Sequence, residues 1–312
     1  MIHLICPNPA IDRTLLVKNF TAERPNRPYE GKDFAGGKSF NVAYAMDFED
    51  GSVPYCIHTI LGGRNGDYLN ELASKRNIQL EITEVEINTR FCTIIVDTTN
   101  TTIYPLYENS FVLDEHLLNK FTQQLLNAVQ PEDMVVFSGS LMKGMPNDYI
   151  AQIKEQLKGQ DIRFFIDTSG QALVEAYKGN PEVIKINDEE LSDLVPDYTF
   201  DRLEDYAHFL KSEAAATIPY FIVTLGEKGV IAKLNQQVYH LCVPPVQAKN
   251  PIACGDFFLG GLVKYLTLGQ LDAVDVLKKA VSYSTANVLN WFPEMKQADI
   301  ERIEQEIIIT PL

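Results

Sequence analysis

The sequence predicts an α/β fold in which helices cover both faces of a mostly parallel central sheet. Short apolar runs rich in β-branched and aromatic residues recur along the chain, with little of the polar alternation typical of a sheet that has one wet face. Segments of helical periodicity separate these runs, which is the order of right-handed crossover units. The last third of the chain becomes helical after Cys254.

The elements follow in order from these patterns. We expect buried strands at residues 2–6, 53–60, 134–137, 163–167, 183–186 and 220–224. Each helix between them needs one apolar face, and the pattern predicts helices at residues 39–48, 66–76, 114–128, 147–157 and 201–213. Three more helices are expected in the C-terminal third, at residues 257–268, 273–290 and 296–307.

Two regions, near residues 11–35 and 88–107, interrupt the alternation of strands and helices. Residues 90–97 and 101–106 have the pattern of a hairpin with its turn at 98–100. We expect the two regions to form one small β sheet standing off a single domain that spans residues 1–312. Such a sheet can serve as a lid over a ligand or as a dimerisation flap, and we expect a homodimer to form through it.

Composition limits the possible partners. The net charge of −15 disfavours nucleic acid and anionic membrane surfaces, and no apolar run is long enough to span a membrane. The first residues lack the basic and then apolar order of a signal peptide, so we expect a cytoplasmic protein. The five cysteines are scattered without a CxxC pair, which argues against a zinc site or a disulfide framework.

Residues 250–256 (NPIACGD) carry the most informative motif, because small residues lead into an aspartate just before a helical pattern. A helix start of this kind offers free N–H groups and a positive dipole end, which bind anions such as phosphate. A carboxylate would repel such an anion unless it served as the base for a nearby hydroxyl group. Asp256 is therefore a candidate base, and a simple N-cap is the competing interpretation.

Residues 36–39 (GGKS) end like a P-loop, but the first glycine of that motif would fall at Lys32, which disfavours it. What remains is a glycine pair that lets the backbone approach a ligand, together with Lys38 and Asn41. The amide of Asn41 can hydrogen-bond hydroxyl groups. A tight turn before a helix would also explain the pattern.

Polar residues follow several expected strands at their carboxyl ends, where open α/β sheets bind ligands. Asp12 follows the first strand, and its carboxylate suits sugar hydroxyls. Ser138 follows the strand at 134–137. Asn187 and Glu190 would share a helix face and suit a magnesium ion held through water, although an N-cap with a first-turn acid explains the pair equally well. The glycines after Thr224 suit either nucleotide phosphates or a turn.

Together these motifs resemble the PfkB family of ribokinase-type carbohydrate kinases, and most closely the branch of 1-phosphofructokinase and tagatose-6-phosphate kinase. The family's hallmarks occur in order: NPAID at 8–12, GGKxxN at 36–41, a Thr-Arg pair at 89–90, SGSL at 138–141, DTSG at 167–170, IKxNxxE at 184–190, TLGxxG at 224–229 and a variant of GAGD at 253–256. The resemblance implies a ribokinase-like three-layer α/β/α domain with a β lid, and it implies ATP and Mg²⁺ as cofactors.

The resemblance also implies a role for each matching residue. It makes Asp256 the catalytic base, with an anion hole formed by Ala253, Cys254 and Gly255. The sugar-phosphate contacts would be Asp12, Gly36, Gly37, Lys38, Asn41, Arg90 and Ser138. The nucleotide contacts would be Lys185, Asn187, Thr224, Gly226 and Gly229, and Asn187 and Glu190 would reach magnesium through water.

Lys38 and Arg90 indicate an acceptor that already carries phosphate, because two cations have little use on a neutral sugar. We therefore expect ATP-dependent phosphorylation of a ketohexose monophosphate, with fructose 1-phosphate first and tagatose 6-phosphate second. Ala253 stands where the family has a glycine, and alanine fits there only if its φ is negative. This departure leaves open a sugar-phosphate-binding protein with little kinase activity.

Overall fold

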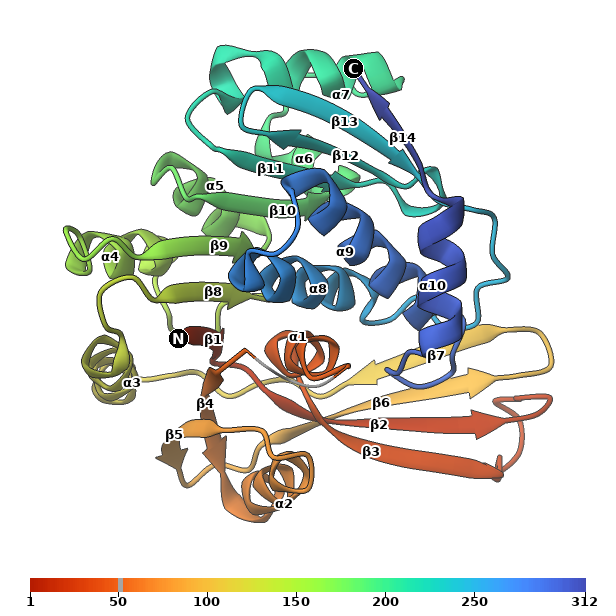
Figure 1. The fold of residues 1–312 in the computed structure, drawn as a ribbon. Coiled ribbons are helices and arrows are strands. Elements are labelled where there is room, and N and C mark those ends of the chain that lie inside the picture. The colour runs from red at the N-terminus through yellow and green to blue at the C-terminus, as the bar shows by residue number, and fades with distance from the viewer. Residues whose placement is uncertain (50–52) are drawn as a thin grey trace.

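A ten-stranded sheet forms the centre of the computed structural model, which describes residues 1–49 and 53–312 (Figure 1). Its strands are β1 (Ile2–Cys6), β4 (Tyr55–Gly62), β5 (Leu80–Val85), β8 (Met134–Ser138), β9 (Arg163–Asp167), β10 (Val183–Asn187), β11 (Tyr220–Thr224), β12 (Val230–Leu234), β13 (Gln237–Cys242) and β14 (Ile308–Pro311). They lie in the order β14-β13-β12-β11-β10-β9-β8-β1-β4-β5. Every pairing from β5 to β11 is parallel, and the pairings from β11 to β14 are antiparallel.

Helices pack on both faces of this sheet and build two separate apolar cores (Figure 1). Leu4 and Ile5 are neighbours in β1 but belong to different cores, as the alternation of side chains along a strand requires. One core contains α1 (Lys38–Met46), α2 (Gly63–Ser74), α8 (Cys254–Leu268), α9 (Ala273–Val288) and α10 (Gln297–Glu306). The other contains α3 (Glu115–Ala128), α4 (Tyr149–Gln156), α5 (Gly170–Lys178), α6 (Asp188–Leu194) and α7 (Leu203–Lys211).

A second sheet of four strands stands beside the first (Figure 1). It consists of β2 (Ala10–Val17), β3 (Glu30–Gly36), β6 (Arg90–Asp97) and β7 (Thr102–Tyr107), in the order β3-β2-β6-β7. We call it the lid sheet. β2 and β6 pair in parallel, and the two outer pairings are antiparallel. Its strands come from the two regions that interrupted the sequence pattern. Closure of this sheet over a ligand, and pairing of two chains through it, stay predictions.

The predicted fold class is confirmed, and the strands that were not predicted lie toward the two edges of the main sheet. β5, α5 and β12 to β14 were not predicted. β5 has exposed glutamates at 81 and 84 because it is an edge strand, so its sequence lacks the continuous apolar run of a buried strand. In the described part of the chain, no helix combines the length and apolar character needed to cross a membrane.

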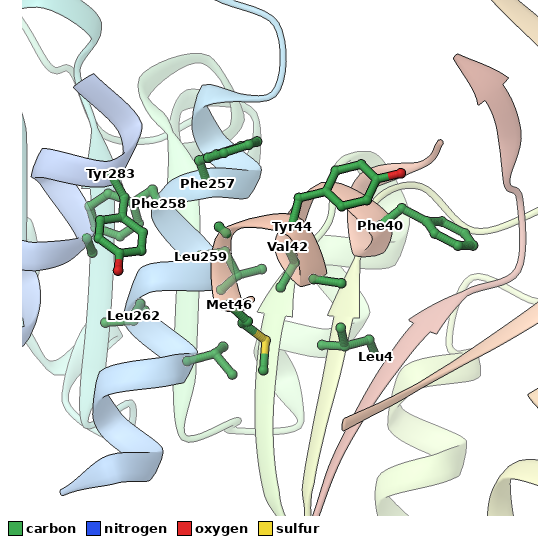
Figure 2. Packing of buried hydrophobic residues seen from close by; sticks show 14 of the residues in the cluster. Leu4, Phe40, Val42, Tyr44, Met46, Phe257, Phe258, Leu259, Leu262 and Tyr283 are labelled. Carbon is green, nitrogen blue, oxygen red and sulfur yellow. The ribbon is translucent and has the colours of Figure 1, made fainter. Parts of the chain in front are cut away.

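Two helices determine where the site forms. α1 and α8 pack against each other in one core, and Figure 2 shows Val42 and Met46 of α1 beside Leu259 of α8. All three side chains are buried, and each buried side chain of this size stabilises the packed state by roughly 1.5–3 kcal/mol. The N-termini of both helices line the same cavity.

Candidate active site

A cavity of about 590 Å³ lies at the carboxyl ends of the parallel strands, and its lining comes from both sheets. Most of the residues predicted from the sequence meet here. They are Asp12, Gly37, Lys38, Asn41, Arg90, Ser138, Lys185, Asn187, Glu190, Thr224, Ala253, Gly255 and Asp256. Four predicted residues, Gly36, Cys254, Gly226 and Gly229, are not among its lining residues.

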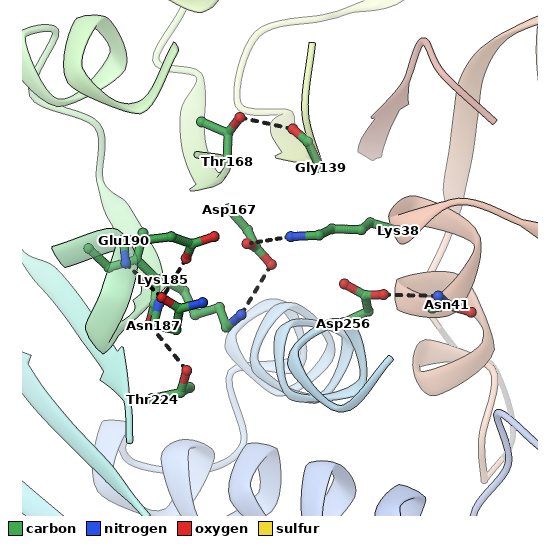
Figure 3. A network of polar contacts seen from close by, with 11 residues as sticks. Lys38, Asn41, Gly139, Asp167, Thr168, Lys185, Asn187, Glu190, Thr224 and Asp256 are labelled. Carbon is green, nitrogen blue, oxygen red and sulfur yellow. Dashed lines mark hydrogen bonds and ion pairs between the residues drawn. The ribbon is translucent and has the colours of Figure 1, made fainter. Parts of the chain in front are cut away.

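Asp256 is the third residue of α8 and is only 6% exposed. The N-cap of this helix is Ala253, so Asp256 does not have the cap role that competed with catalysis. Its Oδ2 accepts a hydrogen bond of 2.9 Å from Nδ2 of Asn41 (Figure 3). Burial raises the pKa of Asp256 to about 6, while Lys38 and the Asn41 hydrogen bond act to lower it. A carboxylate with this pKa is ionised at neutral pH and is a stronger base than an ordinary aspartate.

The start of α8 has no side-chain cap. The N–H of Cys254 donates to the carbonyl of Pro251 at 3.3 Å, so this amide is already occupied. Within the described residues, the N–H groups of Gly255 and Asp256 have no protein acceptor. The anion hole is therefore smaller than the sequence suggested, but two amides and the helix dipole still point at one place.

Ala253 corrects one expectation. Its φ is +66°, in the left-handed region, so the negative φ that was the condition for an alanine to fit here is not found. The fold therefore imposes on this alanine the conformation that a glycine would adopt without strain. At Gly255 a Cβ would lie 2.8 Å from Nζ of Lys185, so a side chain there would displace the ammonium group of this lysine.

Asp167 is the main site residue to which the sequence analysis gave no role. It is fully buried at the end of β9, and it pairs with Nζ of Lys38 at 3.3 Å and with Nζ of Lys185 at 3.2 Å (Figure 3). Burial alone would raise the pKa of Asp167, but the two lysines hold it below its ordinary value. The same pairing raises the pKa of Lys38. Its position as the last residue of a predicted buried strand was the signal that could have identified it.

Asp12 lies inside β2 of the lid sheet, in the region near residues 11–35 that was expected to form this sheet. A Cβ on Gly36 would come within 2.2 Å of the Asp12 carboxyl carbon, so Gly36 makes room for this side chain. Burial raises the pKa of Asp12 to about 7, and the nearby charge of Asp256 adds to the shift, while the backbone of Gly37 acts to lower it.

Arg90 reaches the cavity from the first residue of β6. Its guanidinium donates to the carbonyls of Asn8 at 3.4 Å, Pro9 at 3.4 Å and Glu108 at 3.1 Å. Among the ion pairs of the described residues, none involves Arg90. Neutral carbonyls hold the side chain in position, and its charge also acts to lower the pKa of Asp12 in the same cavity.

Asn187 and Glu190 form a capping box at the start of α6. Oδ1 of Asn187 accepts from the N–H of Glu190 at 2.7 Å, and Oε2 of Glu190 accepts from the N–H of Asn187 at 2.9 Å. Both residues also line the cavity beside Asp167. No group of three metal-ligating side chains occurs in residues 1–49 or 53–312. These residues therefore fit a magnesium ion that keeps most of its water and binds chiefly to substrate phosphates.

The remaining predicted residues divide into two kinds. Ser138 and Thr224 line the cavity, and the hydroxyl of Ser138 is buried without a partner in the described structure. Gly226 and Gly229 shape the turn after β11, with φ of +58° and +88°. A Cβ on Gly229 would lie 2.0 Å from the carbonyl oxygen of Leu241, so this glycine is required by close backbone packing.

Comparison with known proteins identifies the family. Residues 6–290 match the model of the pfkB family carbohydrate kinases. The chain belongs to this family. Tagatose-6-phosphate kinase of Staphylococcus epidermidis is 30% identical over 292 residues, which cover 93% of this chain and 92% of that protein.

Solved structures of the pfkB kinase fold agree with this assignment. Phosphofructokinase-2 from Escherichia coli superimposes with a TM-score of 0.89 at 23% identity, covering 98% of each chain. A possible 1-phosphofructokinase from Thermotoga maritima gives 0.87 at 21% identity, covering 100% of this chain and 99% of that one. The family predicted from the motifs is confirmed, and the protein is an ATP-dependent sugar kinase.

Proposed function

We propose that this kinase phosphorylates a ketohexose that already carries one phosphate group. The observation that carries this proposal is Arg90, a cation that faces the cavity with only neutral carbonyls as partners. A free sugar would offer this guanidinium no anionic hydrogen-bond partner, whereas a phosphate group would form strong charge-assisted hydrogen bonds with it. The net charge of the whole protein is −15, so local cations such as Arg90 must provide the attraction for an anionic acceptor.

We take fructose 1-phosphate, giving fructose 1,6-bisphosphate, as the first candidate and tagatose 6-phosphate as the second. Each is a ketohexose with a phosphate at one end and a free primary hydroxyl at the other. The name of the curated relative, tagatose-6-phosphate kinase, supports the second candidate. A site that binds a phosphate at one end of the sugar and a primary hydroxyl at the other end suits both molecules.

In the proposed reaction, Asp256 accepts the proton of the primary hydroxyl while that oxygen attacks the γ-phosphorus of ATP. The bond from the γ-phosphorus to the bridging oxygen breaks, and ADP leaves with that oxygen. The N–H groups of Gly255 and Asp256, together with Lys38 and Lys185, stabilise the transferred group. Magnesium, when bound, would offset charge on the phosphate oxygens, and Asn187 and Glu190 would hold it through water. Positioning and electrostatics supply most of the rate in such a transfer.

The proposal is tested by measuring ADP formation with a panel of acceptors. The panel contains fructose 1-phosphate, tagatose 6-phosphate, fructose 6-phosphate, and free fructose and tagatose. We expect a ketohexose monophosphate to exceed the free sugars in kcat/KM by about 10²-fold, which corresponds to roughly 3 kcal/mol of contacts to the phosphate. Phosphorus NMR of the product identifies the new ester. A free sugar as the best acceptor would contradict the proposal.

A further inference from the structure

One face of α8 contacts α1 from the first turn of both helices to the C-terminal end of α1. Asp256, Gly260 and Lys264 are spaced by four residues and therefore share that face. Asp256 is bonded to Asn41 at the start of α1. Gly260 lies against the middle of α1, and Nζ of Lys264 donates to the carbonyls of Phe48 and Glu49 just beyond its C-terminal end. The two helices therefore run in the same direction, away from the cavity.

Gly260 marks the closest approach of the two backbones. A Cβ at this position would lie 2.5 Å from Cβ of Ala45 and 2.6 Å from the carbonyl oxygen of Val42. Real Cβ atoms do not come this close to other atoms, and both neighbours belong to the rigid frame of α1. Any side chain at 260 would force α1 away from α8, because neither a backbone carbonyl nor an alanine can rotate aside.

The consequence reaches the cavity, one helical turn away. Asn41 and Lys38 belong to α1, while Asp256 belongs to α8. A change in the spacing between the helices therefore changes the distance between the amide of Asn41 and the carboxylate of Asp256. That hydrogen bond now measures 2.9 Å, and it is one of the contacts that lower the pKa of Asp256.

We propose that Gly260 is a positioning residue for phosphoryl transfer, holding Asn41 of α1 in hydrogen-bond contact with Asp256 of α8. The inference rests on the proposed role of Asp256 as the base. Gly260 touches neither substrate, and its effect is transmitted through the helix spacing. Lys264 secures the far ends of the two helices, so a bulge at 260 acts on the cavity end.

The test is Gly260→Ala, measured by kcat and by the pH profile of kcat/KM. Loss of the Asn41 hydrogen bond should move the acidic limb of the profile upward by about one pH unit. Displacement of the base by a fraction of an ångström should lower kcat by about 10- to 100-fold. Asn41→Ala should move the limb in the same direction. Adding Ala45→Gly to Gly260→Ala removes one of the two clashes and should restore part of the activity.

Gly261→Ala is the matched control. It lies on the same helix but faces α9, where a Cβ would be 3.1 Å from the nearest atom, in Ala280. It should leave the pH profile unchanged even if it lowers stability. If Gly260→Ala does not fold, Ala45→Ser adds one atom from the other side of the same contact, and the same upward shift is expected.

The outcomes separate this inference from the proposed function. A folded Gly260→Ala enzyme with an unchanged pH limb would overturn the positioning role, and so would an equal shift in Gly261→Ala. Full activity of Asp256→Asn would instead refute the role of Asp256 as the base, whatever the results for the Gly260 and Gly261 variants. Loss of activity in Asp256→Asn with normal behaviour of Gly260→Ala would refute only the inference drawn from Gly260.

Discussion

Positively charged side chains have different partners on the two sides of the cavity. At the ends of β9 and β10, Asp167 and Lys185 meet Lys38 of α1, and the two lysines share the buried carboxylate of Asp167. On the side formed by the lid sheet, Arg90 is held by backbone carbonyls alone. On the first side the cations have a carboxylate as ion-pair partner, and on the other side the hydrogen-bond partners of the cation are neutral.

This difference fits what each side is proposed to bind. ATP is expected to bind with magnesium, which brings its own positive charge, so lysines already paired with an aspartate suit that side. A sugar phosphate brings no cation, so its dianion needs a cation of the protein that no ion pair already occupies. Asp256 lies between the two sides, where the acceptor hydroxyl must meet the γ-phosphate. Substitutions of Asp256, and then of one residue on each side of the cavity, test this comparison.

The largest effect is expected from Asp256→Asn. The amide keeps the size of the side chain but cannot accept the hydroxyl proton, so kcat should fall by roughly 10²–10⁴-fold. KM values should change little, because both binding sides stay intact. Steady-state kinetics of purified protein measures both quantities. Near-normal turnover would show that the transfer does not take place at Asp256, between the two sides of the cavity.

Asp167→Asn removes the carboxylate that pairs with Lys38 and Lys185. It leaves Lys185 buried without a carboxylate, and breaking a buried pair of this kind costs about 3 kcal/mol of unfolding free energy. Urea unfolding of the ligand-free protein at neutral pH measures the loss. Because the folded-state pKa of Asp167 is lowered, its contribution is present at neutral pH and is lost as the pH falls below about 4.

Asp33→Asn is the control for this substitution. Asp33 pairs with Arg13 at 2.7 Å on the lid sheet, where the side chain of Arg13 is 40% exposed. Such a pair should contribute less than about 1 kcal/mol. Equal losses in the two variants would mean that Asp167 is an ordinary ion pair and that the two sides of the cavity do not differ in the way described.

Arg90→Ala tests the side of the cavity formed by the lid sheet. Removal of the guanidinium should raise the KM for the sugar phosphate by about 10- to 100-fold, the range expected from one or two charge-assisted hydrogen bonds. The KM for ATP should change far less. Arg13→Ala removes an arginine from the same sheet that is already paired with Asp33, and it should affect neither value. Equal increases for both substrates in Arg90→Ala would contradict its assignment to the acceptor.

The sequence predicted most of the fold because buried parallel strands have a clear signal. The apolar runs that became β1, β9 and β11 were predicted with the bounds observed. The strands added at the antiparallel edge were not predicted, because their burial depends on neighbours that local periodicity does not reveal. β12 is fully buried because its apolar side chains enter the cores on both faces of the sheet, between β11 and β13.

For the site, the sequence identified single residues better than their relations. Asp256, Lys38 and Asn41 were expected near one another, but their hydrogen-bond partners depend on how α1 packs on α8. Asp167 received no role because its importance comes from two lysines that lie 129 and 18 residues away in the chain. Asn187 and Glu190 illustrate another limit, since one pair of side chains can both cap a helix and face a ligand.

The smallest expected effect concerns the start of α8, where both sides of the cavity meet. Ala253 has φ of +66°, a conformation that costs an alanine about 1–2 kcal/mol. Ala253→Gly should relieve this strain, while the greater freedom of glycine in the unfolded chain takes back roughly 0.4–1 kcal/mol. We therefore expect a net gain of about 0.5–1 kcal/mol in unfolding free energy, which calorimetry should detect as a rise in Tm of about 1–3 °C.

The converse substitution at the other end of α8 provides the control. Gly269 has φ of +63°, and a Cβ there would meet no atom within 4 Å. Gly269→Ala therefore introduces the backbone strain alone, without a clash, and should lower the unfolding free energy by about 1 kcal/mol. Opposite shifts of similar size in the two variants would show that Ala253 stores conformational strain beside the anion hole. A fall in Tm for Ala253→Gly would mean that the methyl group contributes more through packing than the left-handed backbone costs.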